Sequence, residues 1–458
     1  MIETKYNNIL QGKKHLHFIG IGGSGMYPLV QILHARGYYI TGSDNNETDT
    51  LNEERKMGIP ITLGHDAKNL GDTDLVVYTA AIRQDNPELV YAKEHDIPVV
   101  ERATMLGLIT RHFENAICIC GTHGKTTTTA MLTQILMRAD MDPSAVIGGK
   151  LPLIGGNGRV GESEVMVCES CEFCDHFLQL YPDTAVVLNI DEDHLEYFKD
   201  LDNIIRSFHK FCEMATRMVI VNGDDANSVK AVEGIDKPIL TFGYGEQNDY
   251  VVSNVRAKDG VTTLFDLSEY GAPLGTFTLG IPGRHNVLNA AAAIISALSA
   301  DADVELIKLG LSEFHGAGRR FEILAKIDGI TIADDYAHHP TELAATLKPA
   351  KELPFRKVWA VFQPFTYSRT AILLDDFAKA LSIADHVVMS EIMGAREVNT
   401  YDIYTKDLAE KIEGSVWFDT FEEIADYVVK HAQPGDLVLT LGCGDIYKAA
   451  KLMINQLS

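Results

Sequence analysis

The residues of this chain best suited to chemistry lie in one stretch, 121–129, which reads Gly-Thr-His-Gly-Lys-Thr-Thr-Thr-Thr. Backbone N–H groups of such a loop bind phosphate oxygens, and the N-terminus of a following helix adds positive potential. A lysine at this position reaches the β- and γ-phosphates, and the next hydroxyl ligates Mg²⁺. The stretch therefore predicts a nucleoside triphosphate site. Its cofactor-binding residues are Gly121, Thr122, His123, Gly124, Lys125, Thr126 and Thr127.

The segments on either side of this loop are those that a phosphate site needs. An apolar run at 116–120 predicts a buried strand, and apolar residues at helical spacing from Ala130 to Leu136 predict a helix. Ile119 stands where the strict pattern has its first glycine, so the loop is a shortened Gly-x-x-Gly-Lys-Thr. The alternative is a polar turn that only caps a helix.

Acidic and imidazole side chains follow two further predicted strands. Glu169 comes directly after the apolar run 165–168, and His194 follows the run 185–189. Metal ligands in open α/β folds lie at the carboxyl ends of strands, beside the phosphate loop. We therefore predict Thr126, Glu169 and His194 as Mg²⁺ ligands or near-ligands. The alternative is that the last two are solvated loop charges.

A second glycine motif lies near the start of the chain. A strand at 15–20 leads into Gly-x-Gly-x-x-Gly at 20–25, a helix follows at 26–36, and Asp44 comes 19 residues after Gly25. A dinucleotide fold has this spacing, but the motif physically supplies a pyrophosphate site, which a UDP-sugar also needs. The predicted substrate-binding residues are Gly22, Gly23, Ser24, Gly25, Met26 and Asp44.

Further polar clusters follow later in the chain. Residues 283–289 open an alanine-rich helix expected at 290–300, and Asn286 and Asn289 project from one face of its first turn. A glycine-rich hinge at 316–318 leads to Arg320, and strand ends present Asp335, His339 and Arg369. Strands and helices alternate throughout, which predicts an α/β protein. We expect three domains, at 1–112, 113–317 and 318–458.

The bulk composition excludes several classes of function. The chain has 458 residues and a net charge of −24, which disfavours general binding to nucleic acid or anionic lipid. The polar first 14 residues and the absence of a long apolar run predict a cytoplasmic protein without membrane insertion. Seven cysteines are expected to be reduced thiols. Cys168, Cys171 and Cys174 have a spacing that also suits a metal, but no fourth ligand has a suitable position.

Together, six ordered motifs resemble the Mur ligases of peptidoglycan synthesis across essentially the whole chain. Besides the two glycine loops they are Asp193-His194, His285-Asn286-x-x-Asn289, Gly318-Arg319-Arg320-Phe321 and 335–342, Asp-Tyr-Ala-His-His-Pro-Thr-Glu. The resemblance implies a UDP-sugar-binding Rossmann-like domain, a central ATPase-like domain and a Rossmann-like C-terminal domain. It is closest for the members that add L-alanine.

What the resemblance implies about activity is specific. In this family ATP phosphorylates the lactyl carboxylate of UDP-N-acetylmuramate, and the amine of L-alanine attacks the acyl phosphate. Lys125, Glu169 and His194 would act with Mg²⁺ in phosphoryl transfer. Asn286, Asn289, Arg320 and Asp335 would bind ATP across a domain junction, and His339 and Arg369 would face the amino acid. We expect a monomer or a homodimer.

The chain departs from the family pattern at two places. The family usually has Glu-Ala-Asp-Glu-Ser-Asp where residues 169–174 read Glu-Ser-Cys-Glu-Phe-Cys, so two acids are lost. It usually has a His-Arg pair where this chain has Phe365 and Thr366. The second departure bears on amino-acid selectivity.

Three alternatives compete with this interpretation. A nicotinamide-dependent dehydrogenase explains only the segment up to Asp44 and leaves Lys125 without a role. A non-catalytic nucleotide-binding scaffold leaves Asp335 and His339 without one. A muropeptide-recycling ligase joins the same sugar to a tripeptide and is the nearest enzymatic alternative.

Overall fold

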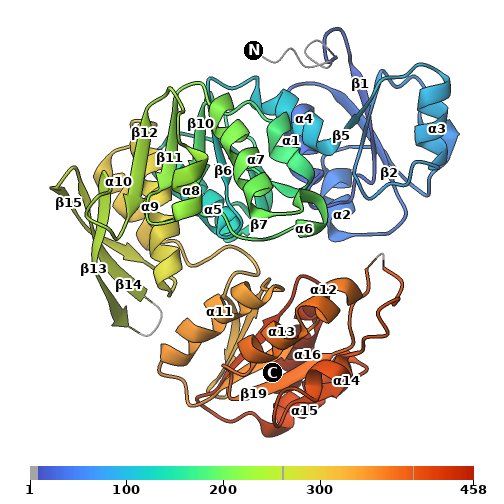
Figure 1. The fold of residues 1–458 in the computed structure, drawn as a ribbon. Helices are drawn as coiled ribbons and strands as arrows, with labels where there is room; N and C mark the ends of the chain where they lie inside the picture. Colours follow the sequence, from blue (N-terminus) through green and yellow to red (C-terminus); the bar gives the residue numbers. More distant parts are fainter. Residues whose placement is uncertain (1–8, 260–261, 396) are drawn as a thin grey trace. The chain divides into compact units, whose positions relative to one another are not determined.

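The computed structural model describes residues 9–259, 262–395 and 397–458, and their strands form three sheets (Figure 1). Two compact units make up the chain. One contains Met1–Ser253, Asp266–Phe277 and Leu288–Ser312, and the other contains Asn254–Phe265, Thr278–Val287 and Glu313–Ser458. Within the described ranges, no helix combines the length and apolar character that crossing a membrane requires.

The first sheet has five parallel strands in the order β3-β2-β1-β4-β5. Its strands are β1 (His15–Ile19), β2 (Tyr39–Asp44), β3 (Ile61–Leu63), β4 (Leu75–Tyr78) and β5 (Val99–Glu101). Its helices are α1 (Tyr27–Ala35), α2 (Asp49–Lys56), α3 (Pro87–Glu94) and α4 (Arg102–Thr110). Leu16 and Phe18 of β1 belong to one core cluster and Ile19 to another, as expected for a strand buried on both faces.

The second sheet has ten strands, in the order β15-β14-β13-β12-β11-β10-β6-β9-β7-β8. The first five in the chain are β6 (Asn115–Cys120), β7 (Ser144–Leu151), β8 (Gly156–Arg159), β9 (Val165–Glu169) and β10 (Thr184–Val187). The rest are β11 (Met218–Asn222), β12 (Ile239–Gly243), β13 (Tyr250–Asp259), β14 (Thr262–Glu269) and β15 (Ala272–Leu279). Because β6 pairs in parallel with both β10 and β9, the carboxyl ends of these three strands meet at one edge.

Six helices accompany this sheet among the described residues, and one of them follows the loop at 121–127. They are α5 (Lys125–Arg138), α6 (Leu195–Phe198), α7 (Leu201–Met214), α8 (Ala226–Ala231), α9 (Arg284–Ser299) and α10 (Val304–Ser312). Gln134 of α5 donates to the carbonyl of Gly310 in α10 at 3.0 Å, which joins these two helices. Helix α9 begins at Arg284, so Asn286 and Asn289 lie inside it, as expected for a segment that opens the helix.

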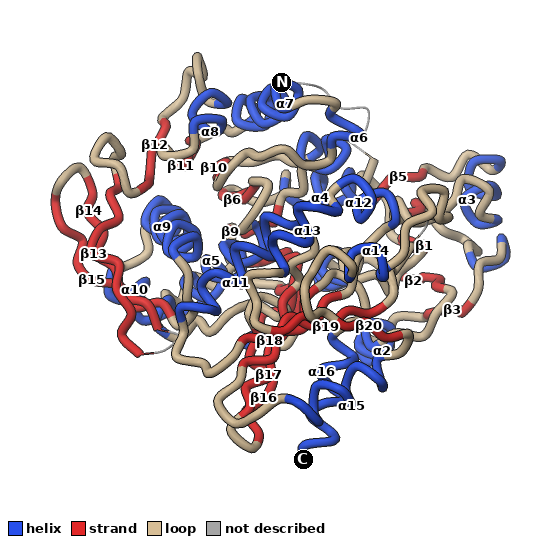
Figure 2. The backbone as a smooth tube through the Cα atoms, turned by 60° about the horizontal axis from the view of Figure 1, so that its bottom comes forward, coloured by secondary structure: helices blue, strands red, loops and turns tan. Residues whose placement is uncertain are grey.

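The third sheet has six strands in the order β16-β17-β21-β18-β19-β20. Its strands are β16 (Glu322–Ile327), β17 (Ile330–Asp335), β18 (Val358–Phe362), β19 (His386–Ser390), β20 (Val416–Phe418) and β21 (Leu437–Leu441). Only β16 is antiparallel to its neighbour (strands red in Figure 2). Its helices are α11 (Pro340–Glu352), α12 (Tyr367–Ile372), α13 (Leu374–Leu381), α14 (Thr405–Ala409), α15 (Phe421–His431) and α16 (Tyr447–Leu457).

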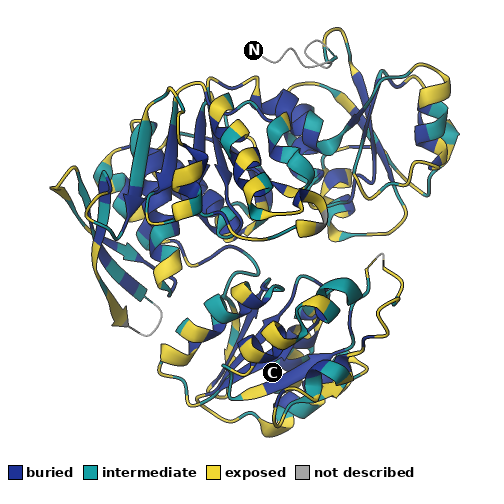
Figure 3. Cartoon of the chain, viewed as in Figure 1, coloured by how far each residue is buried: buried dark blue, intermediate teal, exposed yellow. Residues whose placement is uncertain are grey.

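Both faces of this third sheet are covered by helices. Ala360 of β18 packs in a cluster with residues of α11 and α13, whereas Val361 packs with residues of α15 and α16. The central strands β17, β18 and β21 are accordingly buried and dark blue in Figure 3. Mostly parallel sheets with helices confirm the predicted α/β class, while the boundaries at 112/113 and 317/318 stay predictions.

Candidate active site

The phosphate loop, residues 121–127, connects the buried strand β6 to the N-terminus of α5. Gly124 precedes the helix with φ +87°, a left-handed conformation that favours glycine. A Cβ atom at this position would also collide with the amide of Asn289. The loop therefore needs glycine at this position for two reasons. Asn289 lies against the loop, and its role in binding ATP stays a prediction.

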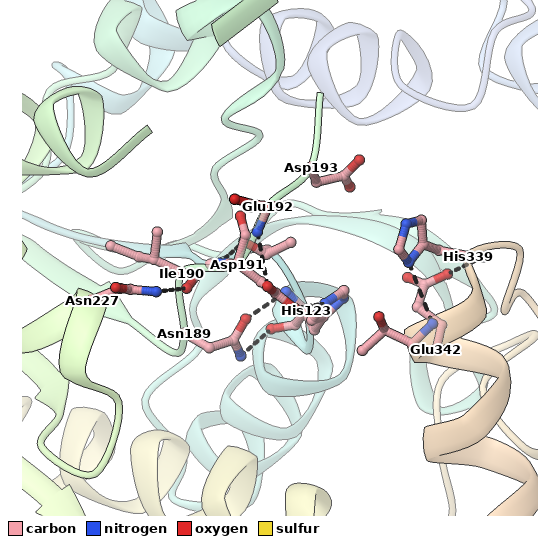
Figure 4. A network of polar contacts seen from close by, with 12 residues as sticks. His123, Asn189, Ile190, Asp191, Glu192, Asp193, Asn227, His339 and Glu342 are labelled. Atoms are coloured by element: carbon pink, nitrogen blue, oxygen red, sulfur yellow. Dashed lines mark hydrogen bonds and ion pairs between the residues drawn. The ribbon is translucent and has the colours of Figure 1, made fainter. Parts of the chain in front are cut away.

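Asn189 holds the phosphate loop from the neighbouring strand end. Its Oδ1 accepts from the backbone N–H of His123 at 2.8 Å, and its Nδ2 donates to the His123 carbonyl at 3.0 Å (Figure 4). The Thr122 N–H donates to the Asn189 carbonyl at 3.0 Å. The sequence analysis did not single out Asn189, although its place after a predicted strand was a signal.

The loop leaves backbone donors available for an anion. Among the described residues, the N–H groups of Gly124, Lys125 and Thr126 have no recorded acceptor, as expected for the first turn of a helix. They stand beside the partial positive charge of the N-terminus of α5. This arrangement suits the phosphates of a nucleotide.

Lys125 is paired with an acid that the sequence analysis did not assign. Its ammonium donates to the carbonyls of Gly121 (2.5 Å) and Thr122 (3.0 Å) and to Oε1 of Glu172 (2.9 Å). Burial alone lowers the pKa of Lys125, but the charge of Glu172 and smaller neighbouring effects outweigh burial and raise it. Lys125 is therefore a charged group at neutral pH.

The side-chain oxygens of Thr126 and Glu169 are suitable ligands for a magnesium ion. The Thr126 hydroxyl donates to Oε1 of Glu169 at 3.0 Å, and the Gly148 N–H donates to Oε2 of Glu169 at 2.6 Å. Mg²⁺ prefers hydroxyl, carboxylate and phosphate oxygens and commonly takes only one or two carboxylates from a protein. The described residues contain no group of three His, Cys, Asp or Glu side chains arranged for a metal, so a nucleotide would have to complete the coordination.

His194 precedes the short helix α6 with φ +54°. Its Nε2 lies 3.7 Å from Oδ2 of Asp193, and its ring meets Phe173 edge-on with centroids 4.8 Å apart. Its role as a metal ligand stays a prediction. Of the three spaced cysteines, Cys168 is buried in the core and Cys171 and Cys174 are half-buried.

The glycine loop, residues 20–25, follows β1 and is held by the end of β2. The N–H groups of Gly20 and Ile21 donate to the Ser43 carbonyl at 2.8 and 3.1 Å. The Gly22 N–H donates to Oδ2 of Asp44 at 3.0 Å, and Oδ1 accepts from Asn46. The predicted ligand carboxylate of Asp44 thus positions the loop itself, and a contact to a ribose stays a prediction.

Two groups beside the glycine loop were missed by the sequence analysis. Asn157 of β8 donates to the Ser24 carbonyl at 2.8 Å. Arg102 begins α4, and a Cβ atom added to Gly25 would lie 3.4 Å from its Cδ. In this part of the described chain the N–H groups of Ser24 and Gly25 have no recorded acceptor. The loop therefore offers two backbone donors with a guanidinium nearby.

In the second compact unit, the two consecutive arginines have different surroundings. Arg319 donates to Asp334 (2.7 Å) and to the carbonyls of Gly442 (2.5 Å) and Gly444 (3.1 Å). The Arg320 guanidinium carbon lies 5.3 Å from the centre of the Tyr336 ring. Arg319 therefore holds the loop after β21, which makes Arg320 the better candidate for a ligand.

Asp335 ends β17 and is buried. Its carboxylate accepts from the N–H groups of Phe321 and Ala337, both at 2.8 Å. Burial raises the pKa of Asp335 to about 6, against the opposing effect of Arg320. This acid therefore titrates near the physiological range.

The two residues expected on the amino-acid side lie at helix starts. His339 caps α11, accepting from the Thr341 N–H at 3.4 Å, while Glu342 accepts from the His339 N–H at 3.3 Å (Figure 4). Arg369 lies in α12, whose cap Thr366 has φ +64°. Asn286 donates from Nδ2 to the Pro282 carbonyl at 2.7 Å. The ligand roles of His339, Arg369 and Asn286 stay predictions.

Comparisons with known proteins agree over nearly the whole chain. Three family models match: the Mur ligase family catalytic domain at 15–114, the Mur ligase middle domain at 119–297 and the Mur ligase glutamate ligase domain at 319–444. This chain is 42% identical to the UDP-N-acetylmuramate–L-alanine ligase from Caldanaerobacter subterraneus subsp. tengcongensis and 44% identical to the one from Clostridium novyi. Each match covers 98% of this chain, with 98% and 99% of the respective relative.

Solved structures are similar over the same length. The UDP-N-acetylmuramate–alanine ligase MurC from Thermotoga maritima is 29% identical with a TM-score of 0.83, covering 97% of this chain and 99% of that one. A murein peptide ligase from Psychrobacter arcticus is 26% identical with a TM-score of 0.74, covering 97% and 98%. Three matching domain models in the expected order, on a scaffold with the phosphate loop and glycine loop described above, place the chain in the Mur ligase family.

Proposed function

We propose that this enzyme joins L-alanine to the lactyl carboxylate of UDP-N-acetylmuramate at the expense of ATP, a step of peptidoglycan precursor synthesis in the cytoplasm. The observation that carries the proposal is the phosphate loop, in which Lys125 binds the Thr122 carbonyl and the Thr126 hydroxyl binds Glu169. Its support is the 42–44% identity over 98% of the chain to ligases of that name.

The first chemical step transfers the γ-phosphoryl group of ATP to a carboxylate oxygen of the sugar. A bond forms between that oxygen and phosphorus, the bond to the β-phosphate oxygen breaks, and ADP leaves. Such a transfer depends on positioning and on neutralising charge. The free N–H groups of the loop and Lys125 bind the phosphates, and Thr126 and Glu169 are the residues that would hold Mg²⁺. The bound ion supplies further charge neutralisation on the phosphate oxygens.

The second step forms the amide. The neutral amine of L-alanine attacks the acyl phosphate carbon, the tetrahedral intermediate collapses, and phosphate leaves while the nitrogen loses a proton. In this proposal His339 and Arg369 bind the amino acid, and Arg320 and Asp335 bind ATP. The glycine loop binds the pyrophosphate of the sugar nucleotide through Ser24 and Gly25.

The test is phosphate release in the presence of UDP-N-acetylmuramate, ATP and Mg²⁺, with a panel of amino acids. Release that depends on L-alanine, with formation of the amide product, is the expected outcome. Equal release with glycine or L-serine would show relaxed selectivity, as the departures at Phe365 and Thr366 permit. Release only with a tripeptide would overturn the proposal in favour of the recycling ligase, the activity suggested by the murein peptide ligase relative.

A further inference from the structure

The ammonium of Lys125 is already saturated with acceptors. It has three N–H donors, and they meet the carbonyls of Gly121 and Thr122 and the carboxylate of Glu172. A phosphate oxygen can bind Lys125 only if one of these three bonds is given up. If the bond to Glu172 is given up, Lys125 keeps its full positive charge for the phosphate; if a carbonyl is given up, Lys125 stays neutralised by Glu172.

The environment of Glu172 makes it the partner that Lys125 keeps. The side chain of Glu172 is 4% exposed, and its second oxygen, Oε2, is buried without a hydrogen-bond partner among the described residues. Its charge is therefore compensated chiefly at Lys125. Leaving a buried carboxylate unpaired costs more free energy than releasing the neutral carbonyl of Gly121 or Thr122, although these two residues are buried as well.

We propose, on the basis of the function proposed above, that Glu172 is a positioning residue that remains bound to Lys125 while the nucleotide binds and reacts. The bond exchanged for a phosphate oxygen is the one to a loop carbonyl. Glu172 then fixes the direction of the ammonium, and the pair as a whole is neutral. The site therefore binds the triphosphate through aligned N–H donors. Net positive charge must come from groups other than the Lys125–Glu172 pair.

This assignment predicts effects of opposite sign for Glu172→Gln. Removing the negative charge beside the phosphates should tighten ATP binding in EDTA, measured by calorimetry, by about tenfold. With saturating ATP and Mg²⁺, kcat should fall by about 10- to 100-fold because the ammonium is less well held. A simple structural defect would instead weaken ATP binding and turnover together.

Glu172→Asp separates charge from position. It keeps the carboxylate but shortens its reach, so ATP binding in EDTA should equal that of the parent while kcat still falls. The matched control is Glu54→Gln, which alters a buried carboxyl group in the first-sheet region and should leave both quantities unchanged. Thermal unfolding of each variant checks that the fold is retained.

Three results would overturn the proposal. One is an unchanged kcat in Glu172→Gln; another is weaker ATP binding in EDTA; the third is recovery of kcat by excess Mg²⁺, which would make Glu172 a metal ligand. The EDTA arm needs neither sugar nor amino acid, so it stands even if the parent enzyme shows no alanine-dependent phosphate release. Failure of the proposed function and failure of this inference are therefore distinguishable.

Discussion

The phosphate loop and the glycine loop are two versions of one local design, a buried parallel strand followed by glycines and a helix. Both leave backbone N–H groups free, at Gly124 to Thr126 in one and at Ser24 and Gly25 in the other. They differ in the side chains around them. In the phosphate loop Lys125 binds the Thr122 carbonyl and the Thr126 hydroxyl binds Glu169, whereas in the glycine loop Asp44 holds the backbone.

This difference matches the different demands of phosphoryl transfer and of binding alone. A phosphoryl group that changes bonds requires charged side chains at fixed positions, because charge develops during the transfer. A pyrophosphate that is only bound requires oriented backbone donors and a nearby cation. The glycine motif near the N-terminus resembles a dinucleotide site. Because such a motif supplies only a pyrophosphate site, it gives no reason to assign redox chemistry to this chain.

The largest expected effect comes from removing the charged group of the phosphate loop. Lys125→Ala should lower kcat at least about 100-fold, because a contact to the transferring phosphoryl group is lost. Lys150→Ala, which alters an exposed lysine of β7, is the matched control and should retain activity. Steady-state phosphate release measures both, and near-normal turnover in Lys125→Ala would remove the proposed distinction between the loops.

A second prediction asks whether the phosphate loop needs residues of the second compact unit. Arg320→Ala and Asp335→Ala should each lower ATP affinity or turnover by about 10- to 100-fold. Arg320 would supply a cation that offsets phosphate charge, and Asp335 holds the N–H of Phe321, the residue after Arg320. Arg319→Ala is the contrasting variant: it should lower the melting temperature, since Arg319 holds the Gly442 and Gly444 carbonyls. Parent-like kinetics in both of the first two variants would mean that the first unit contains a complete site.

The third prediction concerns the glycine loop. Gly22→Val should raise the KM for UDP-N-acetylmuramate about tenfold and leave the KM for ATP nearly unchanged. The reason is steric: a Cβ atom at Gly22 would lie 2.8 Å from Cδ2 of Leu51, which must move together with the loop. Equal increases in both KM values, with a lowered melting temperature, would show a folding defect and no separate sugar site.

The last prediction concerns stability behind the glycine loop and has no expected effect on activity. Glu54 is fully buried, its carboxyl oxygens lack hydrogen-bond partners in the described chain, and burial with the charge of Asp44 raises its pKa from 4.5 to about 8. The folded state therefore favours the neutral acid. The resulting stability is fully present below about pH 4.5 and is lost as the pH rises through about 8.

In Glu54→Gln the side chain cannot ionise, so the loss of stability with rising pH that Glu54 causes should disappear. Between pH 5 and pH 8 the parent should lose up to about 1.4 kcal/mol per pH unit from this group, and the variant should lose correspondingly less. Chemical denaturation at several pH values measures the difference. Parallel pH profiles for parent and variant would contradict the assignment.

Much of the fold was predictable because its signals are local. The apolar runs at 116–120, 165–168 and 185–189 correspond to strands β6, β9 and β10, and the loop at 121–127 joins a strand to a helix as predicted. The segment 283–289 was expected to open a helix, and α9 begins at Arg284. Asp335 was expected at a strand end, and it is the last residue of β17, which pairs with β21.

The phosphate loop could be recognised from the sequence alone, because its glycines, lysine and threonine are neighbours along the chain. The contacts that hold these residues come from tertiary packing. Glu172 reaches Lys125 across 47 positions and Asn189 reaches His123 across 66. Those contacts exist because β9 and β10 flank β6 in one parallel sheet, so the segments that follow the three strands meet at the same edge. Strand order is a property of the packed core, and no local pattern encodes it.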